Sequence, residues 1–305
     1  MASQQELWES DAEARMLENR INGFWNPDYF RNVLLPLFNF KAGDKVLDVG
    51  SGNGALTLLL ARNLPDVYFT GVDITPALVE DARQQAQKLN VENVAFQEGD
   101  ALQLPFENDH FDATVCQTVL MHLADPAKAI AEMSRVLKAG GTFVAAEFHL
   151  LNYDEPVESD LPVSSLEDDI AVSRYIQLLI HGYRASGQGD LKMGGRVPFL
   201  ARKAGLHIVD MRINDRLPHA FPPYAKPSNY MALSDLQGWE NLIKDPAYRS
   251  WLTAAMIAGG GTKADTDAFL KLLPSHHVSV FNGKSDFSFV WLLNPVLLIT
   301  IARKK

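Results

Sequence analysis

A glycine-rich turn preceded by an acidic residue is the feature of this sequence best suited to chemistry. The stretch 46–57, VLDVGSGNGALT, predicts a buried strand, a turn with Gly50, Gly52 and Gly54, and an apolar helix. Such a turn lets backbone N–H groups and a helix N-terminus approach a ligand closely. The spacing G-x-G-x-G is one residue tighter than that of dinucleotide binders, and Asp48 would repel phosphate and attract a cation. The turn therefore predicts a cationic ligand without phosphate.

Three further polar residues follow later strands of the predicted sheet. Asp73, Asp100 and Gln117 each come at or just past the end of an apolar stretch. Because ligands of an open parallel sheet bind beyond the carboxyl ends of its strands, we expect these residues to meet near the glycine turn. Asp73 follows the turn by about 20 residues, a spacing that suits a ribose diol, and Asp100 could accept a hydrogen bond from the exocyclic amine of a base. Each aspartate could instead be an N-cap or turn residue.

The elements that position these residues alternate along the chain. Short strands and helices follow one another with short connections, which predicts a mainly parallel sheet with helices on both faces. We expect a helical cap at 1–40, the ligand-binding core at 41–213, a helical insertion at 214–284 that forms a lid over the acceptor site, and the last strand within 285–305. The expected strands are 46–49, 68–72, 94–97, 111–116, 142–148, 206–213 and 287–301.

Composition limits the classes of function. The 305 residues are 47% hydrophobic and carry a net charge of −9, which argues against binding to nucleic acid because phosphate contacts rely on clustered Lys and Arg. A single cysteine, Cys116, excludes an intrachain disulfide and a cysteine zinc cluster, and His276 and His277 lack partners at metal-ligand spacing, so no metal site is predicted. No signal peptide and no membrane span is recognised, so we expect a cytoplasmic protein.

Several stretches together resemble the class I S-adenosylmethionine-dependent methyltransferases in order and spacing. The resemblance is greatest to the small-molecule group that includes quinone-biosynthesis methyltransferases. It implies an α/β fold, Rossmann-like and doubly wound, with a mostly parallel seven-stranded sheet, an N-terminal helical cap and a helical insertion before the last strand. It also implies S-adenosyl-L-methionine as the cofactor. The stretches that carry the resemblance are 46–57, 71–75, 98–106, 111–117 with 119–123, and 131–141.

The same resemblance implies contacts for individual residues of this chain. Asp48 would face the methionine amino group directly or through water, and Asp73 would hold the ribose hydroxyls. Asp100 would bind the adenine amine, the Ala101 N–H a ring nitrogen, and Gln117 the methionine end through its main chain. The other expected cofactor-binding residues are Gly50, Ser51, Gly52, Gly54, Ile74, His122, Trp25 and Tyr29.

Two aromatic residues and a group of titratable side chains have two interpretations each. Trp25 and Tyr29 could lie beside the sulfonium, although packing of the cap onto the core is the simpler interpretation. A general base is needed only if the acceptor is a hydroxyl or a carbon acid. We take His149 and His122 as candidate catalytic residues, with packing the simpler role for His122. Further candidates are Glu147, Tyr153, His181 and Tyr183.

We therefore predict a methyltransferase that acts on a small apolar or aromatic molecule by in-line displacement. One alternative is a protein that binds S-adenosylmethionine without transferring its methyl group. Another is an RNA or protein methyltransferase, which would need a basic groove or a peptide cleft. A nicotinamide oxidoreductase is disfavoured by the glycine spacing and by Asp48. The expected partner is the small-molecule acceptor, and the oligomeric state stays open, with a homodimer as one option.

Overall fold

The computed structural model divides the chain into two compact units. The first comprises Met1–His149, Lys192–Arg216 and Val296–Lys305, and the second comprises Leu150–Leu191 and Leu217–Pro295. The structure describes residues 25–150, 156–159, 165–215, 219–220, 244–277, 289–291 and 296–305, with the backbone alone at 156–159, 219–220, 272–277 and 289–291.

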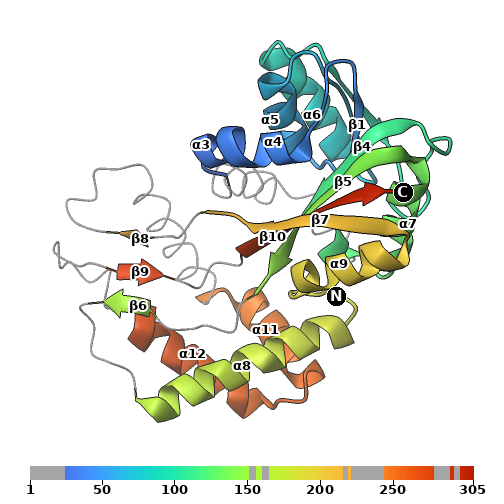
Figure 1. Cartoon of the computed structure of the whole chain (residues 1–305). Helices are drawn as coiled ribbons and strands as arrows, with labels where there is room; N and C mark the ends of the chain where they lie inside the picture. The colour runs from blue at the N-terminus through green and yellow to red at the C-terminus, as the bar shows by residue number, and fades with distance from the viewer. Residues whose placement is uncertain are drawn as a thin grey trace. The chain divides into compact units, whose positions relative to one another are not determined.

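The first unit is built on a seven-stranded sheet with the strand order β3-β2-β1-β4-β5-β10-β7 (Figure 1). The pairs from β3 to β5 are parallel, whereas β10 runs antiparallel to both β5 and β7. The chain moves outward from β1 to β3 and then returns to the other side of β1, where the strand order reverses. This confirms the predicted α/β, doubly wound and mostly parallel fold. The strands span Lys45–Val49 (β1), Tyr68–Asp73 (β2), Val94–Glu98 (β3), Phe111–Gln117 (β4), Leu137–His149 (β5), Leu206–Ile213 (β7) and Val296–Lys304 (β10).

Helices lie on both faces of this sheet, with α4, α5 and α6 on one side and α7 and α9 on the other (Figure 1). Proline at the first position starts two of them, α6 and α7, where its missing N–H costs no hydrogen bond. Asp125 caps α7 by accepting a hydrogen bond from the Lys128 N–H at 3.0 Å. The helices span Pro27–Tyr29 (α3), Phe30–Leu34 (η1), Leu35–Phe38 (α4), Ala55–Asn63 (α5), Pro76–Lys88 (α6), Leu120–His122 (η2), Pro126–Val136 (α7) and Met193–Lys203 (α9).

The described part of the predicted N-terminal cap packs onto the sheet through a row of large side chains. Trp25, Phe30, Leu34 and Phe38 are buried in one cluster with residues of β1, β4, β5 and β10. Burial of side chains of this size stabilises a fold by about 1.5–3 kcal/mol each. The cap is therefore attached by its own apolar face, and the predicted helix within residues 1–24 lies outside the described residues.

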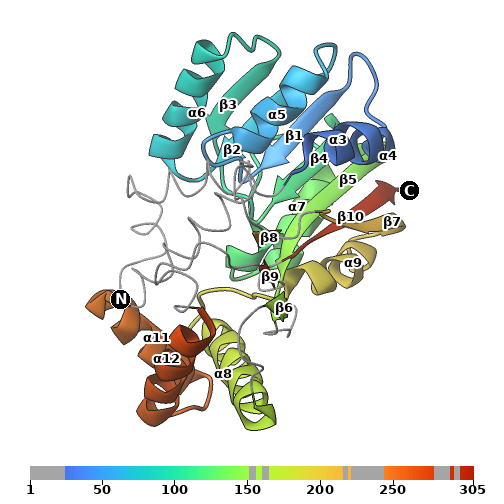
Figure 2. The same ribbon diagram turned by 90° about the vertical axis from the view of Figure 1, so that its left-hand side faces the viewer.

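The described part of the second unit contains three helices and a small sheet (Figure 2). Its core joins α8 to α11 and α12 through buried side chains that include Tyr175, Leu252, Met256 and Phe269. The strand order in the small sheet is β6-β9-β8. The elements span Pro156–Ser159 (β6), Leu166–Ala185 (α8), His219–Ala220 (β8), Pro246–Ala258 (α11), Lys263–His277 (α12) and Phe289–Trp291 (β9).

These elements differ from the predicted ones at three places. Residues 150–191 belong to the second unit, because the apolar face of α8 packs on α11 and α12. The strand expected at 287–301 is two strands, β9 and β10, which belong to different sheets. β5 begins at Leu137 rather than at residue 142. The expected role of 214–284 as a lid stays a prediction.

Two further observations concern membranes and metals. None of the helices in the described part of the chain is both long and apolar enough to cross a membrane. The described residues also contain no group of three or more His, Cys, Asp or Glu side chains arranged to hold a metal ion. The side chains of His276 and His277 lie outside the described set.

Candidate functional site

The strand order brings four of the predicted site segments to one edge of the sheet. β3, β2, β1 and β4 are consecutive neighbours, and all four run in the same direction. The glycine turn follows β1, Asp73 ends β2, Asp100 comes shortly after β3, and Gln117 ends β4. Their carboxyl ends therefore meet where the strand order reverses, between β1 and β4, the usual ligand position in such sheets.

The glycine turn has a backbone that only glycine adopts easily. Gly50, Gly52 and Gly54 have φ angles of +69°, +54° and +81°, in the left-handed region where a Cβ is strained. A Cβ on Gly50 would lie 2.4 Å from Cγ2 of Val119, and one on Gly54 would lie 2.6 Å from Cζ of Phe96. A Cβ on Gly52 would meet none of the described residues within 4 Å. The outer glycines thus serve packing, and Gly52 faces the open side from which a ligand can approach.

Asp73 joins the glycine turn to the start of α6. Its Oδ2 accepts a hydrogen bond from the Gly52 N–H at 2.9 Å, and its Oδ1 accepts one from the Thr75 N–H at 2.9 Å. A carboxylate has about four lone-pair sites, so acceptor capacity is left for hydroxyl groups of a ligand. Ile74, the next residue, is 60% exposed. The structure therefore places Asp73 and Ile74 beside the open side of the turn.

Asp48 lies beneath the turn and is 1% exposed. The Thr57 hydroxyl donates a hydrogen bond of 2.6 Å to its Oδ2. Burial raises the pKa of Asp48 to about 7, and the bond from Thr57 opposes this shift. The carboxylate is thus directed at α5, and a contact with the amino group of a ligand stays a prediction.

Asp100 and Ala101 form a turn after β3. Asp100 is exposed, and its Oδ1 accepts a hydrogen bond of 2.8 Å from the Leu102 N–H. An aspartate that bonds its own backbone two residues ahead is a common turn-former. Ala101 is 9% exposed. Both are near the expected edge, and their contacts with a base stay predictions.

The cap reaches the carboxyl edge of the sheet through Trp25 and, further along it, through Tyr29. The Trp25 indole N–H donates a buried hydrogen bond of 2.9 Å to Oε1 of Gln117 at the end of β4. The Tyr29 hydroxyl instead donates to the Ile213 carbonyl at 3.0 Å, at the end of β7. β7 is four strands from β1, or about 19 Å at the usual strand spacing. A contact of Tyr29 with the cofactor stays a prediction.

Glu147 was expected to be a candidate base, and its surroundings contradict that role. The side chain is fully buried. Its two oxygens accept hydrogen bonds from the backbone N–H groups of three successive residues, Val119, Leu120 and Met121. Burial raises its pKa to about 7, against the lowering effect of these bonds. Glu147 therefore holds the turn after β4, and a sequence pattern alone does not reveal this because the partners are 26 to 28 residues away.

The two histidines proposed for catalysis have different environments. Nδ1 of His149 accepts a hydrogen bond of 3.1 Å from the Gly195 N–H in the first turn of α9. A neutral imidazole that accepts at Nδ1 carries its proton on Nε2, and a catalytic role of His149 stays a prediction. His122 is half-buried and ends η2. Tyr153 lies outside the described residues, and His181 and Tyr183 belong to the second unit.

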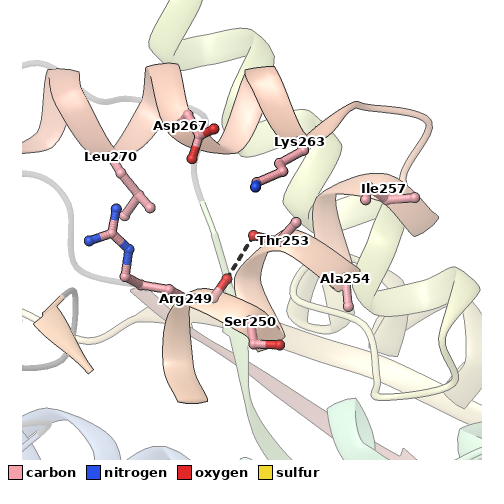
Figure 3. A pocket seen from close by; sticks show the side chains of 8 residues that line it. All are labelled: Arg249, Ser250, Thr253, Ala254, Ile257, Lys263, Asp267 and Leu270. Atoms are coloured by element: carbon pink, nitrogen blue, oxygen red, sulfur yellow. Dashed lines mark hydrogen bonds between the residues drawn. The ribbon is translucent and has the colours of Figure 1, made fainter. Parts of the chain in front are cut away.

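The described residues also form two surface hollows. One, of about 540 Å³, lies between α11 and α12 in the second unit, where Lys263 and Asp267 face Arg249 and Thr253 (Figure 3). The other, also about 540 Å³, lies along α6 and β3. Neither is lined by a predicted site residue, and the mixed charges of the first hollow select no ligand class.

The residues at the edge fit a cofactor with a ribose and a charged amino-acid end. The Ser51 hydroxyl is buried against Gly71 of β2 and has no hydrogen-bond partner among the described residues. Gly52 leaves room for a close approach, and Asp73 keeps free acceptor sites. Acidic groups at this edge suit a cation.

Comparisons with known proteins agree with this geometry. Residues 40–188 match the family model described as a methyltransferase domain. The chain is therefore similar to methyltransferases over this stretch. It is 36% identical over 132 residues to the demethylmenaquinone methyltransferase of Thermus thermophilus, covering 43% of this chain and 60% of the relative. It is 31% identical over 153 residues to the 27-O-demethylrifamycin SV methyltransferase of Amycolatopsis mediterranei, covering 47% and 56%.

The chain also resembles solved structures. The crystal structure of the [4+2]-cyclase SpnF superposes with a TM-score of 0.56 at 19% identity, covering 98% of this chain and 95% of the other. At this identity the likeness shows a shared fold. The chain spans about half the length of the curated relatives it matches.

Proposed function

We propose that this protein transfers the methyl group of S-adenosyl-L-methionine to a small apolar or aromatic molecule. The observation that carries the proposal is the glycine turn, where an open side at Gly52 lies beside Asp73. The match to the methyltransferase domain model and the relatives named for demethylmenaquinone and demethylrifamycin support it. The small-molecule acceptor as partner and a cytoplasmic location belong to the same proposal.

Residues of the sheet edge would hold the cofactor. Asp73 would accept hydrogen bonds from the ribose hydroxyls, and the exposed Ile74 would cover one face of the adenine. Asp100 and Ala101 would contact the edge of the base, and the Gln117 backbone the methionine end. When bound, the cofactor supplies an electrophilic methyl group on a sulfonium.

The protein's part in methyl transfer is to bind, orient and exclude water. The Trp25 indole fixes the Gln117 side chain at the end of β4 and covers it from solvent, since both residues are buried. His149, whose Nδ1 accepts a hydrogen bond from the Gly195 N–H, would contribute to this positioning. Catalysis in this proposal rests on positioning, with no general base assigned.

The first test is stabilisation by the cofactor or its demethylated product, S-adenosylhomocysteine. Ligand at 100 times its Kd stabilises a protein by about 2.7 kcal/mol, which corresponds to a rise in Tm of roughly 5–10 °C. We expect Asp73→Ala to remove most of this rise. Asp112→Ala is the matched control, because Asp112 also accepts a backbone N–H, from Lys45 at 2.9 Å, but at the other end of β4. Absence of a shift in the wild-type protein would overturn the proposal.

Methyl transfer needs its own measurement because this fold also occurs in a protein titled a cyclase. Radiolabelled methyl groups would be followed into a panel of quinols, phenols and polyketide alcohols, with RNA and peptides as comparison acceptors. Labelling of a small molecule supports the proposal. Tight cofactor binding without transfer to any acceptor would favour the alternative of a cofactor-binding protein, and labelling of RNA or peptide would favour the macromolecular alternative.

A further inference from the structure

Glu147 is a buried residue whose carboxylate accepts hydrogen bonds from three successive backbone N–H groups. Its Oε1 accepts hydrogen bonds from the N–H groups of Val119 and Leu120, both at 2.9 Å, and its Oε2 accepts one from Met121 at 3.3 Å. The first N–H groups of a helix have no partner within the helix, and η2 begins at Leu120. The Glu147 carboxylate therefore accepts the hydrogen bonds that the N–H groups at the start of η2 would otherwise donate to water.

The turn before η2 has a strained backbone that depends on such support. Thr118 has a φ of +52°, a left-handed conformation that β-branched residues rarely adopt. Its N–H donates a hydrogen bond of 2.9 Å to the Ala146 carbonyl, one residue before Glu147. Two consecutive residues of β5 thus hold this turn: the Ala146 carbonyl binds Thr118, and the Glu147 carboxylate binds the three residues that follow. Strain of this kind persists only where the surroundings over-determine it.

The supported turn packs directly against the glycine turn. A Cβ on Gly50 would lie 2.4 Å from Cγ2 and 2.6 Å from Cγ1 of Val119. The Val119 side chain therefore fills the space over Gly50. The Gly50 N–H donates to the Val72 carbonyl at 2.8 Å, which ties this point to β2. A displacement of Val119 would reach the glycine turn by direct contact.

We propose that Glu147 is a positioning residue for the cofactor, which holds Val119 against Gly50 and so keeps the glycine turn in its binding conformation. The inference rests on the proposed function for the identity of the cofactor. A carboxylate that only stabilised the fold would change the stability of the unit and leave affinity unaffected. The link through Val119 predicts that affinity changes as well.

The test measures the Kd of S-adenosylhomocysteine by calorimetry, at a temperature where circular dichroism shows every variant folded. Glu147→Gln keeps the side-chain volume and one acceptor oxygen, but its NH₂ group opposes one of the backbone donors. Val119→Ala removes the contact with Gly50 and leaves the backbone donors in place. The control is Leu137→Ala, which substitutes a fully buried residue at the opposite end of β5 from Glu147.

We expect Glu147→Gln and Val119→Ala each to weaken binding by about tenfold, or 1.4 kcal/mol, and Leu137→Ala to bind like the wild type. The double variant should be weaker by less than the product of the two effects, because both act through the same step. Wild-type affinity in Glu147→Gln or Val119→Ala, or effects that multiply independently, would overturn the inference. Absence of binding to the wild-type protein would contradict the proposed function itself. If Glu147→Gln does not fold, Val119→Ala decides alone.

Discussion

The substitution Gly52→Ala separates the cost of the glycine turn's backbone from the cost of blocking a ligand. Gly52 has a φ of +54°, and a Cβ placed there would meet nothing within 4 Å in the described structure. The added methyl group therefore meets open space and clashes with no described neighbour. Any loss of cofactor binding beyond a control would then come from the methyl group entering the ligand's path.

The chain offers a control for the backbone cost. Gly205 has a φ of +84°, and a Cβ there also meets nothing within 4 Å. A left-handed alanine costs roughly 1–2 kcal/mol, so both variants should lose about 2–8 °C in Tm. Gly50→Ala should be less stable than either, because its Cβ would lie 2.4 Å from Cγ2 of Val119. In Gly52→Ala the added methyl group would enter space that the bound ligand fills. Such overpacking costs about 1–3 kcal/mol, which corresponds to a Kd weaker by roughly 5- to 150-fold.

The assay pairs thermal unfolding with titration of S-adenosylhomocysteine for the wild type, Gly52→Ala and Gly205→Ala. Equal stability losses with weaker binding only in Gly52→Ala would support the ligand path assigned to the turn. Equal affinities in the two variants would refute it, because the open side of Gly52 would then face no ligand.

The remaining predictions concern stability. Burial raises the pKa of Asp48 and of Glu147 to about 7. Between pH 5 and pH 7 the folded state therefore keeps protons that the unfolded chain has lost. The free energy of unfolding in urea should fall over this range by about 2 kcal/mol per carboxylate. Asp48→Asn should reduce this fall, and a slope equal to the wild type's would contradict the assignment. In the second unit a Cβ on Gly182 would lie 1.7 Å from the Ala255 carbonyl oxygen, so Gly182→Ala should cost roughly 3 kcal/mol. Gly187→Ala, with a φ of +70° and open space, should cost only about 1 kcal/mol, and equal Tm losses for the pair would contradict the close helix packing.

The sequence alone determined the class of fold and the position of the ligand edge. Alternating strands and helices predict a parallel sheet, and ligands of such sheets bind at the carboxyl ends of the strands. The glycines at 50, 52 and 54 predict positive φ angles at these positions, because other residues adopt such angles only with strain. Asp73 was predictable for the same reason: its place is the end of a strand next to β1. These are properties of short segments and their order.

Only the tertiary structure decided which side chains meet across that edge. Glu147 binds the turn at Val119 because β5 lies beside β4. Tyr29 binds Ile213, 184 residues away, because the cap packs across the sheet from β1 to β10, the neighbour of β7. Asp48 accepts a hydrogen bond from Thr57 of α5 and is buried. α8 joins the second unit because its apolar face packs on α11 and α12. Such contacts depend on strand order and on helix packing, and the residues on either side of each contact carry no local sign of the partner.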